Sequence, residues 1–313
     1  MADISLDHEV VTKAFSGLGV DEKALISTVG RWQHDHKNSF RKSSPNHFLA
    51  DNERQFEKWN EKQVELIKHE VLRFKSALVL WTMHPWERDA RLLKEALTKG
   101  PQGYSLVIEI ACTRSSEELL GARKAYHSLF DSSVEEDVAS HAYGHERKFL
   151  VALVSAYRYE GTRVHDGTAK SEAEALHHAF KTIHPIEDEE VVRILCTRSK
   201  PHLTAIFRHY KELFGKELNE DLHGNPSLKV ALECLVVPAV YFSEALDAAM
   251  RKGADEFTQE ALTRVIVSQA DGNMEEIKAA YQKRFGIPLS EKIEETCLGN
   301  FKEFLLTLVA RGE

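Results

Sequence analysis

The chain has 313 residues, with 41 Lys and Arg against 49 Asp and Glu, so its formal net charge is −8. Hydrophobic residues make up 42% of the chain, with only 16 Gly and 8 Pro. This composition fits a globular protein with a sizeable core, and it excludes collagenous, mucin-like and wholly disordered chains. Because no segment clusters Lys and Arg as phosphate neutralisation requires, we expect no nucleic acid among the partners.

The four Cys are too few for a disulfide framework and none forms a Cys-x-x-Cys pair. Reduced thiols in an intracellular protein are therefore expected, and zinc-finger sites are excluded. Residues 1–9 are polar and acidic, without the basic and apolar regions of a secretory signal. The apolar stretches, such as 77–81, are far shorter than a bilayer span, so the pattern predicts neither a classical signal nor a membrane-spanning segment.

An internal repeat organises the chain. Segment 24–31 is a faint copy of a motif that is clear at 110–115 as Ile-Ala-Cys-Thr-Arg-Ser. The motif returns at 194–199 as Ile-Leu-Cys-Thr-Arg-Ser and weakens at 265–270. The last three copies are anchored on Cys112, Cys196 and Val267. Such periodicity is typical of a fold built from stacked, similar units.

The same apolar pattern follows each of these anchors. The residues 7, 10, 14 and 18 places after the anchor are Leu119, Ala122, Tyr126 and Phe130; Leu203, Ile206, Tyr210 and Phe214; and Met274, Ile277, Tyr281 and Phe285. Spacings of three and four residues put these side chains on one face of a helix. The pattern therefore predicts an amphipathic helix after each anchor.

Each copy closes with an apolar segment, at 74–80, 149–154, 228–237 and 301–308. Strand signals such as alternation with Asn-Gly turns are absent, so we interpret these segments as buried helices. The anchor segments are ambiguous because of their β-branched residues, although the acidic residues at 187–190 suit the first turn of a helix. The first copy also contains an insertion near 43–58, which predicts a surface loop or a short extra helix.

These units together indicate an all-α repeat protein, and several motifs resemble those of the annexin family, plant annexins in particular. They read Gly-Leu-Gly-Val-Asp-Glu at 17–22, His-Pro-Trp-Glu-Arg-Asp-Ala at 84–90, Ala-Cys-Thr-Arg-Ser at 111–115 and Val-Ser-Ala-Tyr-Arg-Tyr-Glu-Gly at 154–161. The resemblance implies an annexin-like array of four five-helix repeats that form one curved disc. The implied repeats span residues 1–84, 85–160, 161–240 and 241–313.

The resemblance also implies a function. Annexins dock on acidic phospholipid through calcium, which loop carbonyls and one carboxylate bind while lipid phosphate fills the open positions. Calcium suits this role because it takes six to eight oxygen ligands. The expected cofactor is thus Ca²⁺, and the expected partners are an acidic phospholipid surface and other proteins such as the cytoskeleton. We expect a cytoplasmic, peripherally membrane-associated protein without enzymatic activity, and a role in stress responses.

The first repeat keeps both glycines of the family's calcium loop. The carbonyls of Phe15, Gly17 and Gly19 are therefore candidate ligands, and Glu70 is the candidate carboxylate. The alternative for the two glycines is a helix C-cap followed by a turn. The alternative for Glu70 is a solvated surface charge.

The fourth repeat keeps one glycine, Gly253, and Glu295 stands near the position of the family's carboxylate, although a solvated charge is again the alternative. In the second repeat Pro101 breaks the loop and His141 stands where an acid is needed. The third repeat has no Gly in the loop at 182–187. We therefore expect calcium sites in the first and fourth repeats, and none in the second and third.

Other readings of the sequence stay open. Cys112 and Cys196 are expected to be small core residues, with a redox pair as the alternative. The alternative to calcium-dependent lipid binding is an annexin-fold scaffold that works through protein partners or through lipid contact without calcium. An α-helical enzyme is the third hypothesis, although the sequence has no recognisable catalytic motif.

Overall fold

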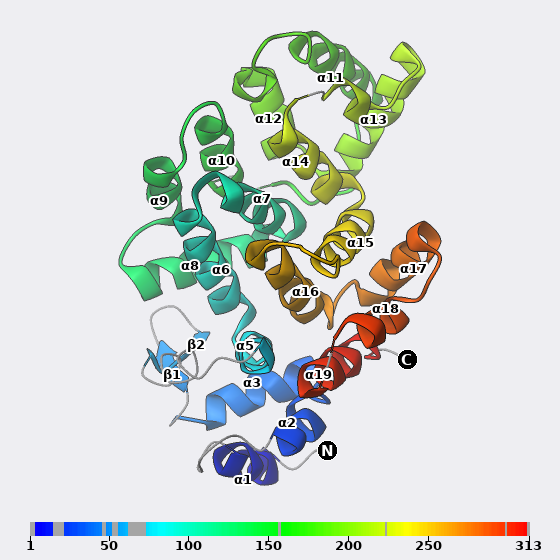
Figure 1. Cartoon of the computed structure of the whole chain (residues 1–313). Coiled ribbons are helices and arrows are strands. Elements are labelled where there is room, and N and C mark those ends of the chain that lie inside the picture. Colours follow the sequence, from blue (N-terminus) through cyan, green and yellow to red (C-terminus); the bar gives the residue numbers. More distant parts are fainter. Residues whose placement is uncertain are drawn as a thin grey trace. The chain divides into compact units, whose positions relative to one another are not determined.

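The structure is a computed structural model that describes residues 4–14, 22–45, 48–51, 56–61, 73–155, 158–222, 224–297 and 299–311. Over these residues the fold is helical, as the sequence predicts, with one small two-stranded sheet (Figure 1). The chain divides into two compact units, Pro85–Tyr241 and a discontinuous unit of Met1–His84 with Phe242–Glu313. Among the described helices, none combines the length and the apolarity that crossing a membrane requires.

The continuous unit consists of α-helices joined by short loops and 3₁₀ turns. Its helices and 3₁₀ turns are α6 (Pro85–Thr98), η1 (Gly100–Gly103), α7 (Tyr104–Thr113), α8 (Ser116–Phe130), α9 (Val134–His141), α10 (Glu146–Ser155), α11 (Asp166–Ala179), η2 (Pro185–Glu187), α12 (Glu189–Thr197), α13 (Lys200–Phe214), η3 (Leu218–Asp221) and α14 (Pro226–Val236). Within it α6 packs on α7 and α8, α11 packs on α12 and α13, and α7 packs on α14. The ambiguous anchor segments are therefore helical, and they form the ends of α7 and α12.

The amphipathic helices predicted after the anchors are α8, α13 and α17 (Met274–Phe285). Their shared tyrosines, Tyr126, Tyr210 and Tyr281, are fully buried. Each ring packs on the phenylalanine one turn later in the same helix, with ring centroids 4.7 to 4.9 Å apart. Burial of so large a ring at the same place in each copy explains why the sequence pattern is strongest there.

Arg158, in the segment between α10 and α11, ties the two halves of the continuous unit together. Its guanidinium is buried and donates hydrogen bonds to the carbonyls of Leu195 (2.6 Å) and Arg198 at the C-terminal end of α12. The carbonyl of Arg158 itself accepts a hydrogen bond from the Ser116 hydroxyl at the start of α8. A cation suits this place because the last carbonyls of a helix lack partners within the helix and carry partial negative charge.

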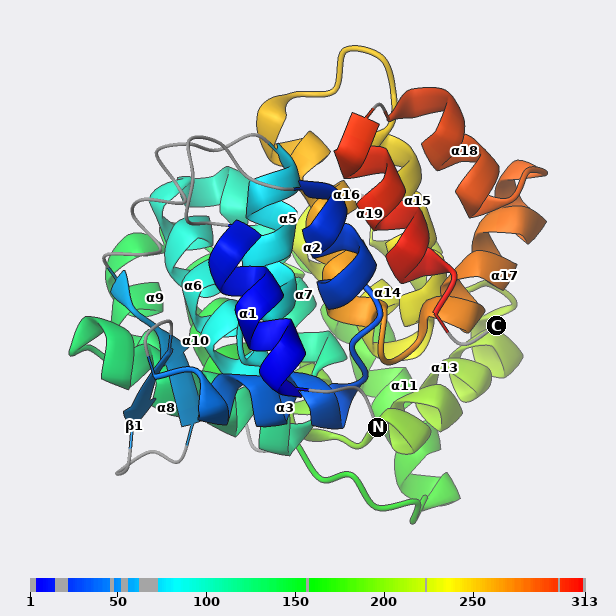
Figure 2. The same cartoon turned by 90° about the horizontal axis from the view of Figure 1, so that it is seen from below.

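The discontinuous unit brings the first and last quarters of the chain into one core. Its described helices are α1 (Ile4–Ala14), α2 (Glu22–Val29), α3 (His34–Ser43), α5 (Arg73–Thr82), α15 (Pro238–Ala249, which begins in the other unit), α16 (Glu256–Gln269), α17, α18 (Leu289–Thr296) and α19 (Gly299–Val309). Figure 2 shows α2, α5, α16 and α19 side by side, and these helices pack on one another. Phe74 of α5 meets Phe304 of α19 edge to face, with ring centroids 5.7 Å apart.

Trp81 of α5 marks the place where the two chain ends meet. The indole is 1% exposed and donates a hydrogen bond to the carbonyl of Val29 (3.0 Å). The Lys37 ammonium lies 3.3 Å and the Arg311 guanidinium 4.9 Å from the ring centroid. Asp271 forms ion pairs with both cations, which balances two positive charges over one aromatic ring.

The insertion near residues 43–58 contains a β-hairpin, where the sequence predicted a loop or a short helix. Strands β1 (Phe48–Asp51) and β2 (Phe56–Trp59) pair antiparallel, with Phe48 opposite Trp59. The rings of this pair lie 4.5 Å apart, and Phe48 also packs on Phe40 of α3. Cross-strand aromatic pairs stabilise a hairpin through packing. Such a hairpin needs neither alternating apolar residues nor an Asn-Gly turn, so these signals do not predict it.

Replacing Arg158 by Met is expected to lower the free energy of unfolding by about 2 kcal/mol, because helix-end carbonyls in a buried place lose their donor. The urea midpoint checks this. Arg163 is exposed on the same segment, and its replacement by Met is the matched control, with an expected effect within about 0.5 kcal/mol. Equal midpoints for the two variants would contradict the capping role of Arg158.

Candidate functional site

The first predicted calcium site lies outside the described residues. Phe15, Gly17 and Gly19 follow the end of α1, and Glu70 precedes α5. The site therefore stays a prediction from the sequence. The corresponding loops of the second, third and fourth repeats are among the described residues.

The fourth predicted site is described at both of its residues. Gly253 lies between α15 and α16 with φ +85°, a left-handed conformation that glycine adopts without strain. Glu295 is exposed near the end of α18 and lies 3.4 Å from the ammonium of Lys292. Burial, Asp247 and Glu295 all raise the pKa of Tyr281, whereas Arg251, two residues before Gly253, lowers it. The loop and the predicted carboxylate thus lie around the same buried tyrosine.

The backbone of this fourth loop is already bonded within the chain. The Ala254 carbonyl accepts a hydrogen bond from the side-chain amide of Gln259 (2.7 Å). Asp255 is the N-cap of α16, and its carboxylate accepts hydrogen bonds from the backbone N–H (3.0 Å) and the hydroxyl (2.8 Å) of Thr258. These bonds lower the pKa of Asp255. Neither Gln259 nor Asp255 was predicted from the sequence, although an Asp just before a helix is a capping signal.

The second loop has a different form. Residues Gly100–Gly103 make a 3₁₀ turn, and a Cβ on Gly103 would lie 1.9 Å from the Ala96 carbonyl oxygen. His141, at the place of the family's acid, contacts the Asp137 carbonyl through Nδ1 (2.8 Å). The hydroxyl of Tyr104 accepts a hydrogen bond from the backbone N–H of Tyr143 (2.9 Å). This loop is therefore fixed by contacts with α6 and with the α9–α10 loop.

The third loop joins α11 to α12 and carries η2. Ile183 in this loop is 90% exposed, and the imidazole of His184 stacks on that of His145 with ring centroids 3.6 Å apart. Asp188 caps α12, because its carboxylate accepts hydrogen bonds from the N–H groups of Glu190 and Val191. The predicted acidic first turn of this helix is thus confirmed.

The arginine of each Thr-Arg-Ser motif is bound to an acid in the helix that precedes the second or the third loop. Arg114 makes two hydrogen bonds with Asp89 of α6, at 2.6 and 2.8 Å. Arg198 contacts Glu172 of α11 through Nε (2.9 Å) and Nη2. Paired guanidinium and carboxylate groups are strong and directional, so each fixes the helix before its loop against the end of the helix after it.

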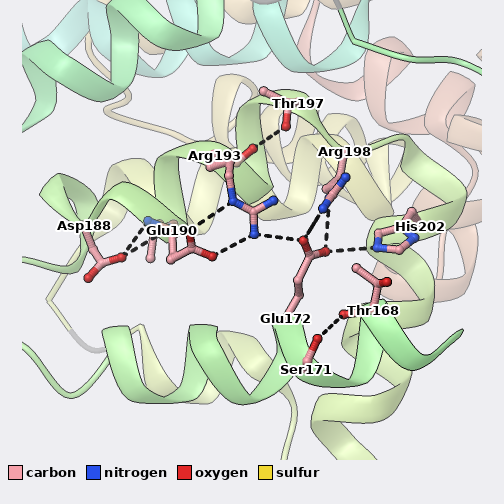
Figure 3. Close-up of polar contacts among 10 residues, drawn as sticks. Thr168, Ser171, Glu172, Asp188, Glu190, Arg193, Thr197, Arg198 and His202 are labelled. Atoms are coloured by element: carbon pink, nitrogen blue, oxygen red, sulfur yellow. Dashed lines mark hydrogen bonds and ion pairs between the residues drawn. The ribbon is translucent and has the colours of Figure 1, made fainter. Parts of the chain in front are cut away.

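The Glu172 carboxylate contacts three side chains that donate hydrogen bonds to it, as Figure 3 shows. Besides Arg198, it accepts hydrogen bonds from Arg193 of α12 (2.9 Å) and from His202 of α13 (3.0 Å). Its side chain is 6% exposed, whereas Arg193 and Arg198 are 39% and 35% exposed. Burial raises the pKa of Glu172, but the hydrogen bonds from Arg198, Arg193 and His202 outweigh it, so the pKa is lowered.

The buried tyrosines form a second set of polar contacts. The Tyr126 hydroxyl donates to Asp137 (2.5 Å), Tyr210 donates to Asp221, and Tyr281 donates to Asp247 (3.3 Å). Burial and the neighbouring carboxylate raise the pKa of each phenol.

Asp137 receives further hydrogen bonds from Lys94 and Ser132. Burial raises its pKa, but these bonds and the one from Tyr126 outweigh it and lower the pKa to about 2. Like Glu172, this carboxylate is therefore held as an anion by groups already bound to it.

The four Cys are free and buried. Burial raises the pKa of Cys112 to about 11 and that of Cys196 to about 12. Both thiols therefore have the properties of inert core residues. Within the part of the chain that the structure describes, no group of three or more His, Cys, Asp or Glu is placed to hold a metal.

Replacing Glu172 by Gln is expected to cost about 2 kcal/mol of unfolding free energy at pH 7, because three donors lose a buried anion. Since the folded-state pKa is lowered, the stabilisation is present above the unfolded pKa and is lost as pH falls through the folded pKa. Urea midpoints of both proteins between pH 7 and 3 test this. Glu190→Gln, at an exposed partner of Arg193, is the control, and an equal loss in both variants would contradict the role of Glu172.

The annexin family model matches residues 88–153, 171–227 and 241–308. Annexin D4 of Arabidopsis thaliana is 50% identical over 99% of this chain and 99% of its own length. Annexin-like protein RJ4 of Fragaria ananassa is 38% identical, over 98% of this chain and 96% of its own length.

Among solved structures, a point mutant of annexin A8 with an intact N-terminus superimposes with a TM-score of 0.82 at 28% identity, covering 99% of this chain and 95% of that chain. The family is typically non-enzymatic, in agreement with the expectation from the sequence. The matches to the family model, to plant annexins over the full length and to a solved annexin structure agree, and this chain belongs to the annexin family.

Proposed function

We propose that this protein binds anionic phospholipid surfaces in a calcium-dependent manner, with Ca²⁺ bridging loop carbonyls and a carboxylate to lipid phosphate. Calcium-dependent binding to phospholipid is general among annexins, which supports this proposal. The chain acts as four repeats of residues 1–84, 85–160, 161–240 and 241–313. It associates peripherally with the membrane from the cytoplasm.

Two sites carry the calcium in this proposal. The first repeat supplies the carbonyls of Phe15, Gly17 and Gly19, with Glu70 as the carboxylate. The fourth repeat supplies the carbonyl of Gly253, with Glu295. The observation that carries the proposal is the left-handed turn at Gly253. Arg251, just before this turn, and Glu295 both act on the buried Tyr281. Gly allows a tight loop to aim carbonyls at one point.

The net charge of −8 explains why a cation is needed. An anionic leaflet repels an acidic protein unless positive charge intervenes between the two. A calcium ion with ligands on one side only, and with positions open to lipid phosphate, provides that charge at the point of contact. In this mechanism the second and third loops bind no calcium, because Pro101, His141 and the glycine-free loop at 182–187 replace the ligands.

A specific observation favours a second candidate, an annexin-fold scaffold that works without calcium through protein partners, such as the cytoskeleton, or through direct lipid contact. In the fourth loop the amide of Gln259 already holds the Ala254 carbonyl, and Glu295 lies next to Lys292. The first contact occupies the carbonyl next to the predicted ligand Gly253, and the second engages the predicted carboxylate of Glu295. Calcium must compete with them.

Cosedimentation with phosphatidylserine vesicles at pH 7.5 separates the two candidates. The first predicts pelleting with millimolar calcium and none with chelator. Replacing Glu295 or Glu70 by Gln is expected to raise the calcium concentration for half-maximal pelleting by about tenfold, since each variant loses the charged ligand of its site. Glu294→Gln, at the exposed residue next to Glu295, is the matched control with no expected change.

Equal pelleting with calcium and with chelator would reject the first candidate and leave the scaffold. Calcium-dependent pelleting that neither Glu70→Gln nor Glu295→Gln alters would keep the function but reject these carboxylates as ligands.

A further inference from the structure

Four helices of the discontinuous unit meet at their C-terminal ends. These helices are α2, α5, α16 and α19, which pack on one another (Figure 2). The last residue of α2 is Val29, and Trp81 lies one residue before the end of α5. Asp271 lies two residues after α16, and Arg311 lies two residues after α19. The meeting point therefore joins the first and the last quarters of the chain.

The side chains that tie these helix ends together form one group, which we call the helix-end cluster: Lys37, Trp81, Asp271 and Arg311. Two carbonyls at the end of α2 accept hydrogen bonds from it. The Val29 carbonyl accepts from the Trp81 indole (3.0 Å), and the Gly30 carbonyl accepts from Nη1 of Arg311 (2.9 Å). Such carbonyls lack partners within their own helix, so these donors fix the end of α2 to α5 and to the end of α19.

Asp271 completes the cluster on the side of α16. Its Oδ1 accepts a hydrogen bond from Nη2 of Arg311 (2.9 Å), and its Oδ2 forms an ion pair with Lys37 of α3. The side chains of Lys37 and Arg311 are each 8% exposed. Removing one partner of a buried ion pair leaves an uncompensated charge, so the contacts of this cluster form and break together.

Close packing of α2 on α19 gives the cluster a defined closed arrangement. A Cβ on Gly30 would lie 2.8 Å from Cγ2 of Thr307, so the two helices touch where Arg311 bonds to the Gly30 carbonyl. Packed cores switch between discrete arrangements and do not deform continuously. The helix-end cluster therefore has a closed state, seen in the structure, and an open state in which the four helix ends are released.

The opposite ends of the same four helices carry the proposed calcium ligands. In the first repeat, residues 15–19 precede α2 and Glu70 precedes α5. In the fourth repeat, Gly253 precedes α16 and Glu295 precedes α19. Each proposed site thus takes its loop from the start of one helix and its carboxylate from the segment before another. The spacing between loop and carboxylate is set in advance while the cluster holds the helices in place, and preorganisation of this kind raises affinity.

A calcium ion at either site consequently stabilises the closed state. A ligand that binds one of two states better shifts the protein toward that state. The apparent affinity of the other site then rises, because a larger fraction of the protein is in the state that binds. The two sites interact in this way without touching each other, since they share one set of helix-end contacts.

We propose that the helix-end cluster couples the calcium sites of the first and fourth repeats, so that calcium at one site raises the affinity of the other. The inference rests on the proposed function, which supplies the two sites. The coupling is reciprocal, and a factor of about fivefold is expected. Arg311 and Asp271 act in it as positioning residues and are not ligands.

Hydrogen exchange of the full-length protein, with millimolar calcium and with chelator and without lipid, reads each site separately. Glu70→Gln removes the carboxylate of the first site and leaves the fourth intact. In this variant calcium is expected to slow exchange from Gly253 into α16, and also to slow it by up to about fivefold in α2 and α5. In Glu295→Gln the remote slowing is expected in α16 and α19.

Further variants locate the coupling. Adding Arg311→Gln to Glu70→Gln is expected to keep the slowing near Gly253 and to remove the slowing in α2 and α5. Asp271→Asn carries the same expectation and serves where Arg311→Gln does not fold, as judged by circular dichroism. Arg284→Gln is the matched control, because Arg284 forms an ion pair with Glu244 elsewhere in the same unit. This control is expected to keep the remote slowing.

Slowing confined to the calcium-bound loop in both Glu70→Gln and Glu295→Gln would overturn the coupling. Remote slowing that persists in both Arg311→Gln and Asp271→Asn would also overturn the role of the cluster. If calcium slowed exchange nowhere in the wild-type protein, the sites themselves would be rejected and the coupling with them. Local slowing without remote slowing rejects the coupling alone, so its failure is distinguishable from failure of the proposed function.

Discussion

An ion pair between an arginine and a carboxylate fixes the two helices that flank the second loop, and a matching ion pair fixes those that flank the third. Arg114 holds Asp89, and Arg198 holds Glu172, so the helix before each loop and the helix after it are joined at a point away from the loop itself. The loop then connects two fixed ends, and its own contacts differ from one copy to the next. This explains how one framework carries a 3₁₀ turn with two glycines in one copy and exposed Ile183 with a stacked imidazole in the next.

The first and fourth copies have other polar groups at the place of this ion pair. At the matching place in the fourth copy stands Gln269, which is 5% exposed, and in the first copy Asp7 accepts hydrogen bonds from Trp32 and His36 instead of pairing with Arg31. The polar partner thus differs between copies while the helices stay in place. Apolar packing sets the helical frame, and in the continuous unit the pairing of Arg114 with Asp89 and of Arg198 with Glu172 adds direction to it.

The sequence predicted the frame better than the sites, for a physical reason. Helix periodicity and the repeated tyrosines are local patterns, and they identified α8, α13 and α17 because each residue's neighbours lie within one or two turns. The acid that binds Arg198 is a Glu 26 residues away, whereas the acid that binds Arg114 is an Asp 25 residues away. Neither a fixed spacing nor a fixed residue type therefore predicts these pairs. The hairpin at 48–59 was missed for a similar reason, since it is held by contacts between aromatic rings.

For the candidate ligands, the local pattern correctly placed Gly253 in a left-handed turn, but it did not predict the hydrogen bond from Gln259 to Ala254. The cysteines are a further case. Repetition drew attention to Cys112 and Cys196, yet their burial and raised pKa give them the chemistry of core residues, which favours the first of the two readings of these thiols.

The division of the chain into a continuous and a discontinuous unit has a consequence for biosynthesis. As the polypeptide leaves the ribosome, residues 85–241 can complete their core from consecutive segments, whereas residues 1–84 lack the partners that α16 and α19 supply until the last quarter has been made. The first quarter must therefore wait through most of translation with its aromatic core surface uncovered. Closing so long a loop adds little entropic cost, because that cost grows only slowly with length, so the delay is one of synthesis and not of thermodynamics.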